Sequence, residues 1–164
     1  MKYLSILFAA SMLMACGGGE QTETKEETPQ AAEQPAATKE VVEVTIESND
    51  QMQYDKKTIE VPAGTRVKLT LKNVGTMPIE SMGHNWTLLE QSADLVAYAT
   101  AAITAKDNGY QPADKYADAI IYTKLLGPGE SETIEFDAPA AGTYKYLCTF
   151  PGHYGTMQGD FIVK

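Results

Sequence analysis

The stretch Val42-Glu43-Val44-Thr45-Ile46-Glu47 alternates apolar and polar side chains along the chain. A period of two is typical of a β-strand that buries one face and exposes the other. Segments of the same type recur at residues 58–61, 67–71, 84–89, 120–125, 130–136, 143–148 and 159–163. Gly- and Pro-rich turns at 62–64, 127–129 and 138–142 separate several of them. Short alternating strands with frequent turns predict an all-β fold, an antiparallel Greek-key β-sandwich.

One segment departs from this two-residue period. Residues 92–107 include an Ala-rich run with a candidate N-cap at Ser92, and this pattern predicts a helix. An irregular turn is expected at residues 108–112, which contain Asn, Gly and Pro. The sequence therefore predicts a β-sandwich with one inserted helix.

Length and charge narrow the possible functions. The chain has 164 residues, a length that allows one folded domain after processing. Its formal net charge is −9. No basic patch is available to neutralise phosphates, so nucleic acid is not expected as a partner. An acidic protein suits a basic or neutral partner better, because its charge affects the rate of encounter.

The N-terminus has the features of an export signal. A short basic start precedes an apolar run over residues 4–14, which is too short to span a bilayer as a mature helix. The run ends in Leu13-Met14-Ala15-Cys16, which resembles the lipobox of bacterial lipoproteins. This resemblance implies a signal peptide over residues 1–15, lipidation of Cys16 and anchoring to a bacterial membrane on its periplasmic or cell-surface side. An ordinary secretory signal with a nearby cysteine is the alternative.

The next segment lacks the residues that build a core. Residues 17–40 contain no aromatic residue and no Leu, Ile or Val. They cannot bury enough apolar surface to offset the conformational entropy lost on ordering. We therefore expect residues 16–40 to form a lipid-anchored disordered tether, with residues 41–164 as the folded domain. A simple spacer would have the same composition.

A set of metal-binding side chains stands out in the folded part. Residues 148–157 read CTFPGHYGTM, which places Cys148, His153 and Met157 in one short segment, and the other histidine of the chain is His84. Two imidazoles, one thiolate and a weak thioether are the donors of a mononuclear copper electron-transfer site. Three alternatives compete: a Cys–His nucleophile and base, a zinc site, and ordinary packing of the methionine. Only the copper interpretation uses all four residues.

Four segments carry a resemblance to a known family. They are NDQMQY at 49–54, MGHNW at 82–86, TKLLG at 123–127 and CTFPGH at 148–153. From about residue 41 to 164 the chain is similar to azurin, a type 1 blue copper protein of the cupredoxin family. The spacing C-x4-H-x3-M is that of azurin, whereas the corresponding loop of plastocyanin is shorter.

The resemblance implies roles for individual residues. His84, Cys148 and His153 would be the strong copper ligands, Met157 the weak axial ligand, and the Gly83 carbonyl a distant axial contact. Asn85 and Phe150 match residues that brace the ligand loop and bond to the thiolate. An apolar patch for docking partners would comprise Met82, Pro151, Gly152 and Met52, with Tyr54 at its border. Core packing is the alternative for Met52 and Tyr54, and Trp86 is assigned to the core.

The sequence also departs from the azurin pattern. Val42 and Thr65 stand where azurins usually carry a disulfide, so this cross-link should be missing. Val74 stands where many azurins carry a second histidine near the copper, so the redox behaviour coupled to that histidine should be missing too.

The expected function follows from the resemblance. We expect one copper ion, cycling between Cu(I) and Cu(II), in a protein that shuttles single electrons and is not an enzyme. A c-type cytochrome as donor and an oxidase or nitrite reductase as acceptor are implied at the family level. A copper chaperone or storage protein is the alternative function, and a zinc- or cysteine-dependent hydrolase is a third.

Overall fold

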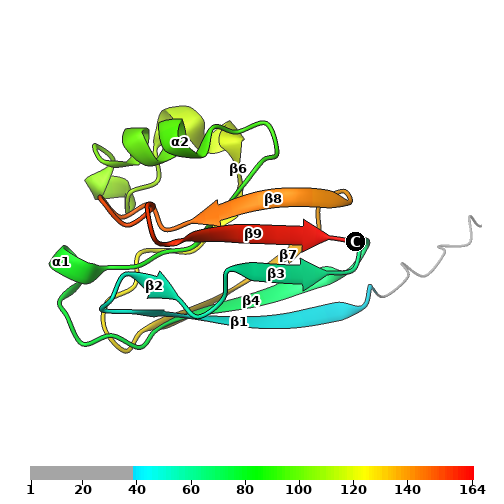
Figure 1. The fold of residues 1–164 in the computed structure, drawn as a ribbon, viewed down its shortest axis with the longest axis horizontal. Coiled ribbons are helices and arrows are strands. Elements are labelled where there is room, and N and C mark those ends of the chain that lie inside the picture. The colour runs from blue at the N-terminus through cyan, green and yellow to red at the C-terminus, as the bar shows by residue number, and fades with distance from the viewer. Residues whose placement is uncertain (1–38) are drawn as a thin grey trace, which may run out of the picture. The chain divides into compact units, whose positions relative to one another are not determined.

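A computed structural model describes residues 39–164 of the chain. The predicted signal peptide at residues 1–15, the lipidation site Cys16 and nearly all of the predicted tether at residues 16–40 lie outside the described residues. Within the described part, the strands form two sheets that pack as a sandwich (Figure 1). The predicted all-β sandwich is therefore confirmed.

The two sheets contain four and five strands. The smaller sheet has the order β2 (Gln53–Tyr54), β1 (Val41–Asn49), β4 (Arg66–Asn73), β7 (Ser131–Asp137). The larger has the order β3 (Thr58–Val61), β9 (Gln158–Val163), β8 (Gly142–Leu147), β5 (Thr87–Leu89), β6 (Ala119–Tyr122).

The expectation of an antiparallel sandwich is correct for most strand pairs and wrong for two of them. Strand β1 pairs with β4 in parallel, and β3 pairs with β9 in parallel, while the remaining pairs are antiparallel. The chain passes from β1 through β3 in the other sheet before it returns as β4, so these neighbours are joined by a crossover. Alternation in a sequence reports which face of a strand is buried and does not report the direction of its neighbour.

The core lies between the two sheets. Strand β4 contributes Val67, Leu69 and Leu71, all fully buried, as its alternation predicts. Trp86 is also fully buried, and its ring lies 5.5 Å from that of Tyr146 between centroids. The core assignment of Trp86 is correct. Tyr54 is only 4% exposed, so core packing accounts for this residue too.

The inserted helix is present, but it begins later than predicted. Helix α2 spans Leu95–Ala102, and its N-cap is Asp94 rather than Ser92. The Asp94 carboxylate accepts hydrogen bonds from the N–H groups of Val96 and Ala97, at 2.9 and 3.0 Å. It therefore satisfies N–H groups that the first helical turn leaves free. Helix α2 packs on the larger sheet through Tyr98 and Ala99.

Several short elements escaped the sequence analysis or differ from it. They are α1 (Ile79–Met82), two 3₁₀ turns, η1 (Lys106–Asn108) and η2 (Ala113–Asp118), and the two-residue strand β2. The segment 84–89 is a strand only from Thr87 onward, and 120–125 only to Tyr122. Before Thr87, His84 instead forms an isolated bridge with Leu126. The reason is local, because the chain there leaves the sheet to approach the ligand loop.

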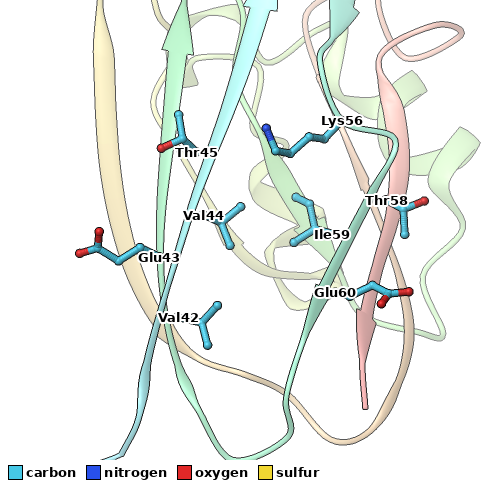
Figure 2. Close-up of a pocket in the computed structure, with 8 residues that line it drawn as sticks. All are labelled: Val42, Glu43, Val44, Thr45, Lys56, Thr58, Ile59 and Glu60. Atoms are coloured by element: carbon cyan, nitrogen blue, oxygen red, sulfur yellow. The ribbon is translucent and has the colours of Figure 1, made fainter.

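One side of the sandwich is hollowed between β3 and the first half of β1, which precedes the pairing of β1 with β2. A shallow pocket of about 270 Å³ lies there. Figure 2 shows Val42, Val44 and Ile59 pointing into it, with Glu43 and Glu60 on its outer side. None of its lining residues is His, Cys or Met, so this pocket lacks the predicted metal donors.

The predicted metal donors gather at one end of the sandwich. Figure 1 shows α1 and the connection from β8 to β9 at the end opposite the C-terminus. Over residues 39–164, no helix has the length and apolar character needed to cross a membrane.

Candidate metal centre

The predicted ligands come from two separate parts of the fold. Cys148 directly follows β8, and His153 and Met157 lie in the loop that leads to β9. His84 follows α1, where its backbone exchanges two hydrogen bonds with Leu126, at 2.8 and 3.1 Å. This bridge fixes the backbone of His84 against the β6–β7 connection, at a position 64 residues before Cys148 in the sequence.

Three of these side chains converge on one point. The ligand atoms of His84, Cys148 and His153 all lie within 4.8 Å of one another. The Cys148 Sγ is 3.7 Å from Nδ1 of His153, and the centroids of the two imidazole rings are 5.0 Å apart. His84 and Cys148 are fully buried and His153 is 3% exposed. The arrangement can therefore enclose a single ion away from bulk water.

The loop that carries the other ligands is closed by its own backbone. The Cys148 N–H donates to the Met157 carbonyl at 2.9 Å, and the Met157 N–H donates to the His153 carbonyl at 2.8 Å. The His153 N–H donates to the Phe150 carbonyl at 3.0 Å. These bonds place the fully buried Met157 next to Cys148 in the same core cluster.

The histidines fit a metal ion better than they fit ordinary packing. Neither ring nitrogen of His84 has a hydrogen-bond partner of normal geometry within residues 39–164, although both are buried. A buried, unpartnered nitrogen is unfavourable unless something else accepts its lone pair. A metal ion between His84, Cys148 and His153 would supply that partner, and nitrogen and sulfur donors suit copper.

Burial disfavours the charged form of all three groups. It raises the pKa of the Cys148 thiol to about 11, against the opposing N–H groups of Asn85 and Phe150 and the Tyr54 hydroxyl. Burial, followed by the nearby His84, lowers the pKa of His153 to about 4. Burial also lowers the pKa of His84, although the backbone of Asn49 opposes this effect. Neutral imidazoles have free lone pairs, and a bound cation would displace the thiol proton.

Asn85 links the two ligand-bearing segments directly. The Thr149 N–H donates to Asn85 Oδ1 at 2.8 Å, and Asn85 Nδ2 donates to Thr149 Oγ1 at 2.7 Å. Because Asn85 follows His84 and Thr149 follows Cys148, this bridge ties together the backbones that carry two of the ligands. Thr149 was not singled out in the sequence, where only its place beside Cys148 could have indicated this role.

Other predicted site residues surround the centre. The Phe150 ring lies 4.5 Å from the His153 ring between centroids. Gly83 is buried immediately before His84, and its N–H donates to the Ile79 carbonyl at 3.0 Å. Tyr54, expected to border a docking patch, instead points inward and donates to the Asn85 carbonyl.

The residues of the predicted docking patch are at least partly accessible. Met52 is 36% exposed, Gly152 is exposed, and Met82 and Pro151 are partly buried. Met52 is brought to the ligand loop by Thr156, whose hydroxyl donates to the Met52 carbonyl at 2.8 Å. Met77, which was not assigned to the patch, is 40% exposed in the segment before α1.

Comparison with known proteins places this site in context. The model of the family described as copper binding proteins, plastocyanin/azurin family, matches residues 40–164. The chain is 36% identical over 125 residues to azurin of Pseudomonas fluorescens biotype C, covering 74% of this chain and 97% of that protein. It is 42% identical over 121 residues to azurin of Bordetella pertussis, covering 71% and 79%. It is 39% identical over 118 residues to outer membrane protein H.8 of Neisseria gonorrhoeae, covering 70% and 63%.

Solved structures give the same relationship. Reduced auracyanin from Roseiflexus castenholzii superposes with a TM-score of 0.67 at 40% identity, covering 74% of this chain and 96% of that one. An azurin from Methylomonas sp. strain J superposes with a TM-score of 0.66 at 34% identity, covering 74% and 97%.

Proposed function

The chain belongs to the plastocyanin/azurin family of copper-binding proteins, and on that premise we propose that one copper ion is held by His84, Cys148 and His153. The protein is a blue copper electron-transfer protein. The observation that supports this ligand set best is the convergence of three buried donor groups within 4.8 Å. When bound, copper supplies a one-electron couple between Cu(I) and Cu(II).

The surrounding residues hold the ligands in place. Met157 would be a further, weak ligand of the copper through its buried thioether, and the Gly83 carbonyl would add a weak contact. Asn85 braces the ligand loop through Thr149, and Phe150 contributes its backbone N–H to Cys148 and its ring to His153. Hydrogen bonds around the ligands orient them and tune the metal. Backbone hydrogen bonds close both the ligand loop and the His84 bridge, so the fold itself holds the segments that carry the ligands.

Redox partners dock on the apolar patch formed by Met52, Met82, Pro151 and Gly152. The patch lies on the ligand loop and next to His84, so a protein seated there comes close to His153. An uncharged surface of modest size suits a complex that forms and separates quickly. A c-type cytochrome is the donor, and an oxidase or nitrite reductase is the acceptor.

The N-terminal part anchors the protein to a membrane. Residues 1–15 are a signal peptide, Cys16 carries the lipid, residues 16–40 are a tether, and residues 41–164 are the copper domain. One relative carries the name outer membrane protein H.8, which supports a place on the periplasmic or cell-surface side of a bacterial membrane. More than one acyl chain would be needed for stable anchoring.

The other functions considered for this sequence fit the site less well. A copper chaperone or storage protein needs accessible ligands, whereas Cys148 and His84 are fully buried. A cysteine nucleophile needs a thiolate, whereas the Cys148 pKa is raised to about 11 and the His153 pKa is lowered to about 4. Zinc would prefer a water or carboxylate to the buried thioether of Met157. Azurin-type cupredoxins are electron carriers. We propose that this protein likewise carries electrons and has no enzymatic activity.

The ligand assignment is tested by adding Cu(II) to the purified, metal-free protein. We expect an intense blue colour that disappears on reduction and returns on reoxidation. The Cys148→Ser variant should stay colourless, whereas Cys16→Ser should become blue like the unmodified chain. Equal colour in Cys148→Ser would show that the thiolate is not a ligand. The same Cys16→Ser variant tests the anchor, because it should leave the membrane fraction.

A further inference from the structure

Gln111 occupies a buried position between the inserted helix and the metal centre. Its side chain is 3% exposed and makes three hydrogen bonds to neighbouring side chains. The Tyr98 hydroxyl of α2 donates to Gln111 Oε1 at 2.9 Å. Gln111 Nε2 donates to Thr87 Oγ1 at 2.9 Å and, more weakly, to Thr149 Oγ1 at 3.4 Å. The acceptor and both hydrogens of this amide are thus matched by partners inside the fold.

These bonds reach the bridge that joins the two ligand-bearing segments. Thr149 Oγ1, which accepts from Gln111, also accepts from Asn85 Nδ2. The same Asn85 amide donates its other hydrogen to the carbonyl of Gly109 at 3.1 Å. The segment from Gly109 to Gln111 therefore contacts both halves of the bridge. Its Gly109 carbonyl contacts Asn85, and its Gln111 side chain contacts Thr149.

The backbone of this segment is strained, which is unusual for a simple connection. Gly109 has φ of +63° and Tyr110 has φ of +64°. The left-handed region costs a residue with a large side chain energy that the surrounding contacts must offset. The Tyr110 ring packs against Phe150 with its centroid 5.0 Å away. The strain is located where the chain turns to place the Gly109 carbonyl and the Gln111 amide next to the bridge.

We propose that Gln111, oriented by Tyr98, is a positioning residue for the copper centre that holds the Asn85–Thr149 bridge in a single geometry. This inference rests on the proposed function of the site. It also gives the inserted helix α2 a role. Tyr98 of this helix holds Gln111, and Gln111 contacts Thr149, the residue after Cys148. Within residues 39–164 the Gln111 side chain makes no hydrogen bond to a proposed ligand, and it acts through Thr149.

The Tyr98 hydroxyl donates its hydrogen in this arrangement. Burial raises the pKa of Tyr98 well above its usual range, so the hydroxyl keeps its proton at any working pH. That hydrogen is donated to Gln111 Oε1, which pairs the oxygen end of the amide with α2. The Nε2 group is then directed at the two threonines, and the amide cannot rotate without losing bonds at both ends.

The first test uses the metal-free protein, and it does not depend on copper chemistry. Variants Tyr98→Phe and Gln111→Met are compared with Tyr144→Phe, which removes the bond from another buried tyrosine to the Ala140 carbonyl. The measured quantity is hydrogen exchange of the Thr149 N–H, with the Leu69 N–H of β4 as reference. We expect Thr149 to exchange about tenfold faster in both test variants, the change typical of losing one hydrogen bond. Tyr144→Phe should leave the Thr149-to-Leu69 ratio unchanged.

The second test uses the copper-loaded variants. Electron self-exchange should slow on the order of tenfold in Tyr98→Phe, because a looser bridge lets the ligands rearrange between oxidation states. Tyr144→Phe should exchange electrons at the unmodified rate. The proposal is overturned if Thr149 exchange in Tyr98→Phe matches that in Tyr144→Phe, or if Leu69 accelerates equally, which would indicate only lost stability. It is also overturned if Thr149 exchange rises while self-exchange stays the same. A failure of the protein to turn blue would contradict the proposed function and leave the exchange result standing.

Discussion

The carbonyl oxygen of Ile79 lies 2.7 Å from the position that a Cβ on Gly83 would occupy. Leu125 closes the same space from the other side, with two side-chain carbons 3.0 Å away. A side chain immediately before His84 would therefore displace α1 or the segment that carries Leu125. The φ of Gly83 is −66°, which any residue can adopt. A glycine is therefore needed here because of the crowding and not because of the backbone conformation.

Replacing Gly83 by Ala should lower the free energy of unfolding by about 1–3 kcal/mol, the usual cost of overpacking. Gly155→Ala is the matched control in the same region, because nothing lies within 4 Å of its added Cβ and its φ is not positive. Denaturant unfolding of the two metal-free variants gives both values. Equal stabilities of Gly83→Ala and Gly155→Ala would mean that α1 can shift to make room for the added methyl group at no cost in free energy.

Asn85→Leu should remove both halves of the bridge to Thr149 while keeping a side chain of similar size. The Thr149 N–H would be left buried without its partner, which costs about 1–3 kcal/mol. Gln91→Leu is the control, since Gln91 donates a hydrogen bond to the Thr143 carbonyl from an exposed position. We expect that control to change stability by less than about 0.5 kcal/mol. Comparable losses in the two variants would contradict a special role for the bridge.

Asp50 should make the stability of the protein depend on pH in the acid range. Its carboxylate accepts hydrogen bonds from the Thr76 N–H and hydroxyl and from the Met77 N–H. The bond from the Thr76 backbone, against some burial, lowers the pKa of Asp50 below its ordinary value of 3.8. The folded state thus binds a proton less readily than the unfolded chain, and the stabilisation is present above that ordinary value.

The expected result is a stability difference that disappears in acid. The unmodified protein should be more stable than Asp50→Ala at neutral pH, and the difference should shrink as the pH falls through the lowered pKa of Asp50. Unfolding by denaturant at several pH values between about 2 and 7 measures it. A difference that does not change with pH would show that the carboxylate charge is irrelevant.

Trp86 should tolerate another aromatic ring far better than a small side chain. Its ring contacts Phe136, Tyr146 and Phe161, and its Nε1 has no hydrogen-bond partner within residues 39–164. Trp86→Ala should cost about 3–5 kcal/mol, because it leaves a cavity in the core.

Trp86→Phe should cost clearly less than Trp86→Ala. The phenyl ring keeps contacts with the neighbouring aromatic rings, and the substitution removes the buried N–H group that lacks a partner. Thermal and denaturant unfolding of both metal-free variants gives the loss in free energy of unfolding for each. Similar losses in the two would indicate that the indole nitrogen does have a partner, such as a buried water.

Much of the fold was predictable because alternation is a local property of a strand. The pattern Val67, Leu69, Leu71 matched three fully buried positions of β4. The same kind of pattern did not predict that β1 and β4 run in parallel, because that pairing depends on the excursion of β3 into the other sheet. It also misplaced the start of α2, because Ser92 and Asp94 are both acceptable caps and only the backbone geometry selects one.

The sequence alone determined the types and order of the donor groups, since Cys148, His153 and Met157 lie within ten residues of one another. A short loop constrains its own members whatever surrounds it. The tertiary structure alone decided which backbone holds the expected ligand His84, and that Tyr98 of α2 reaches Thr149 through Gln111. Those contacts depend on hydrogen bonds between segments far apart in the chain, and no local periodicity encodes which distant partner a buried polar group will meet.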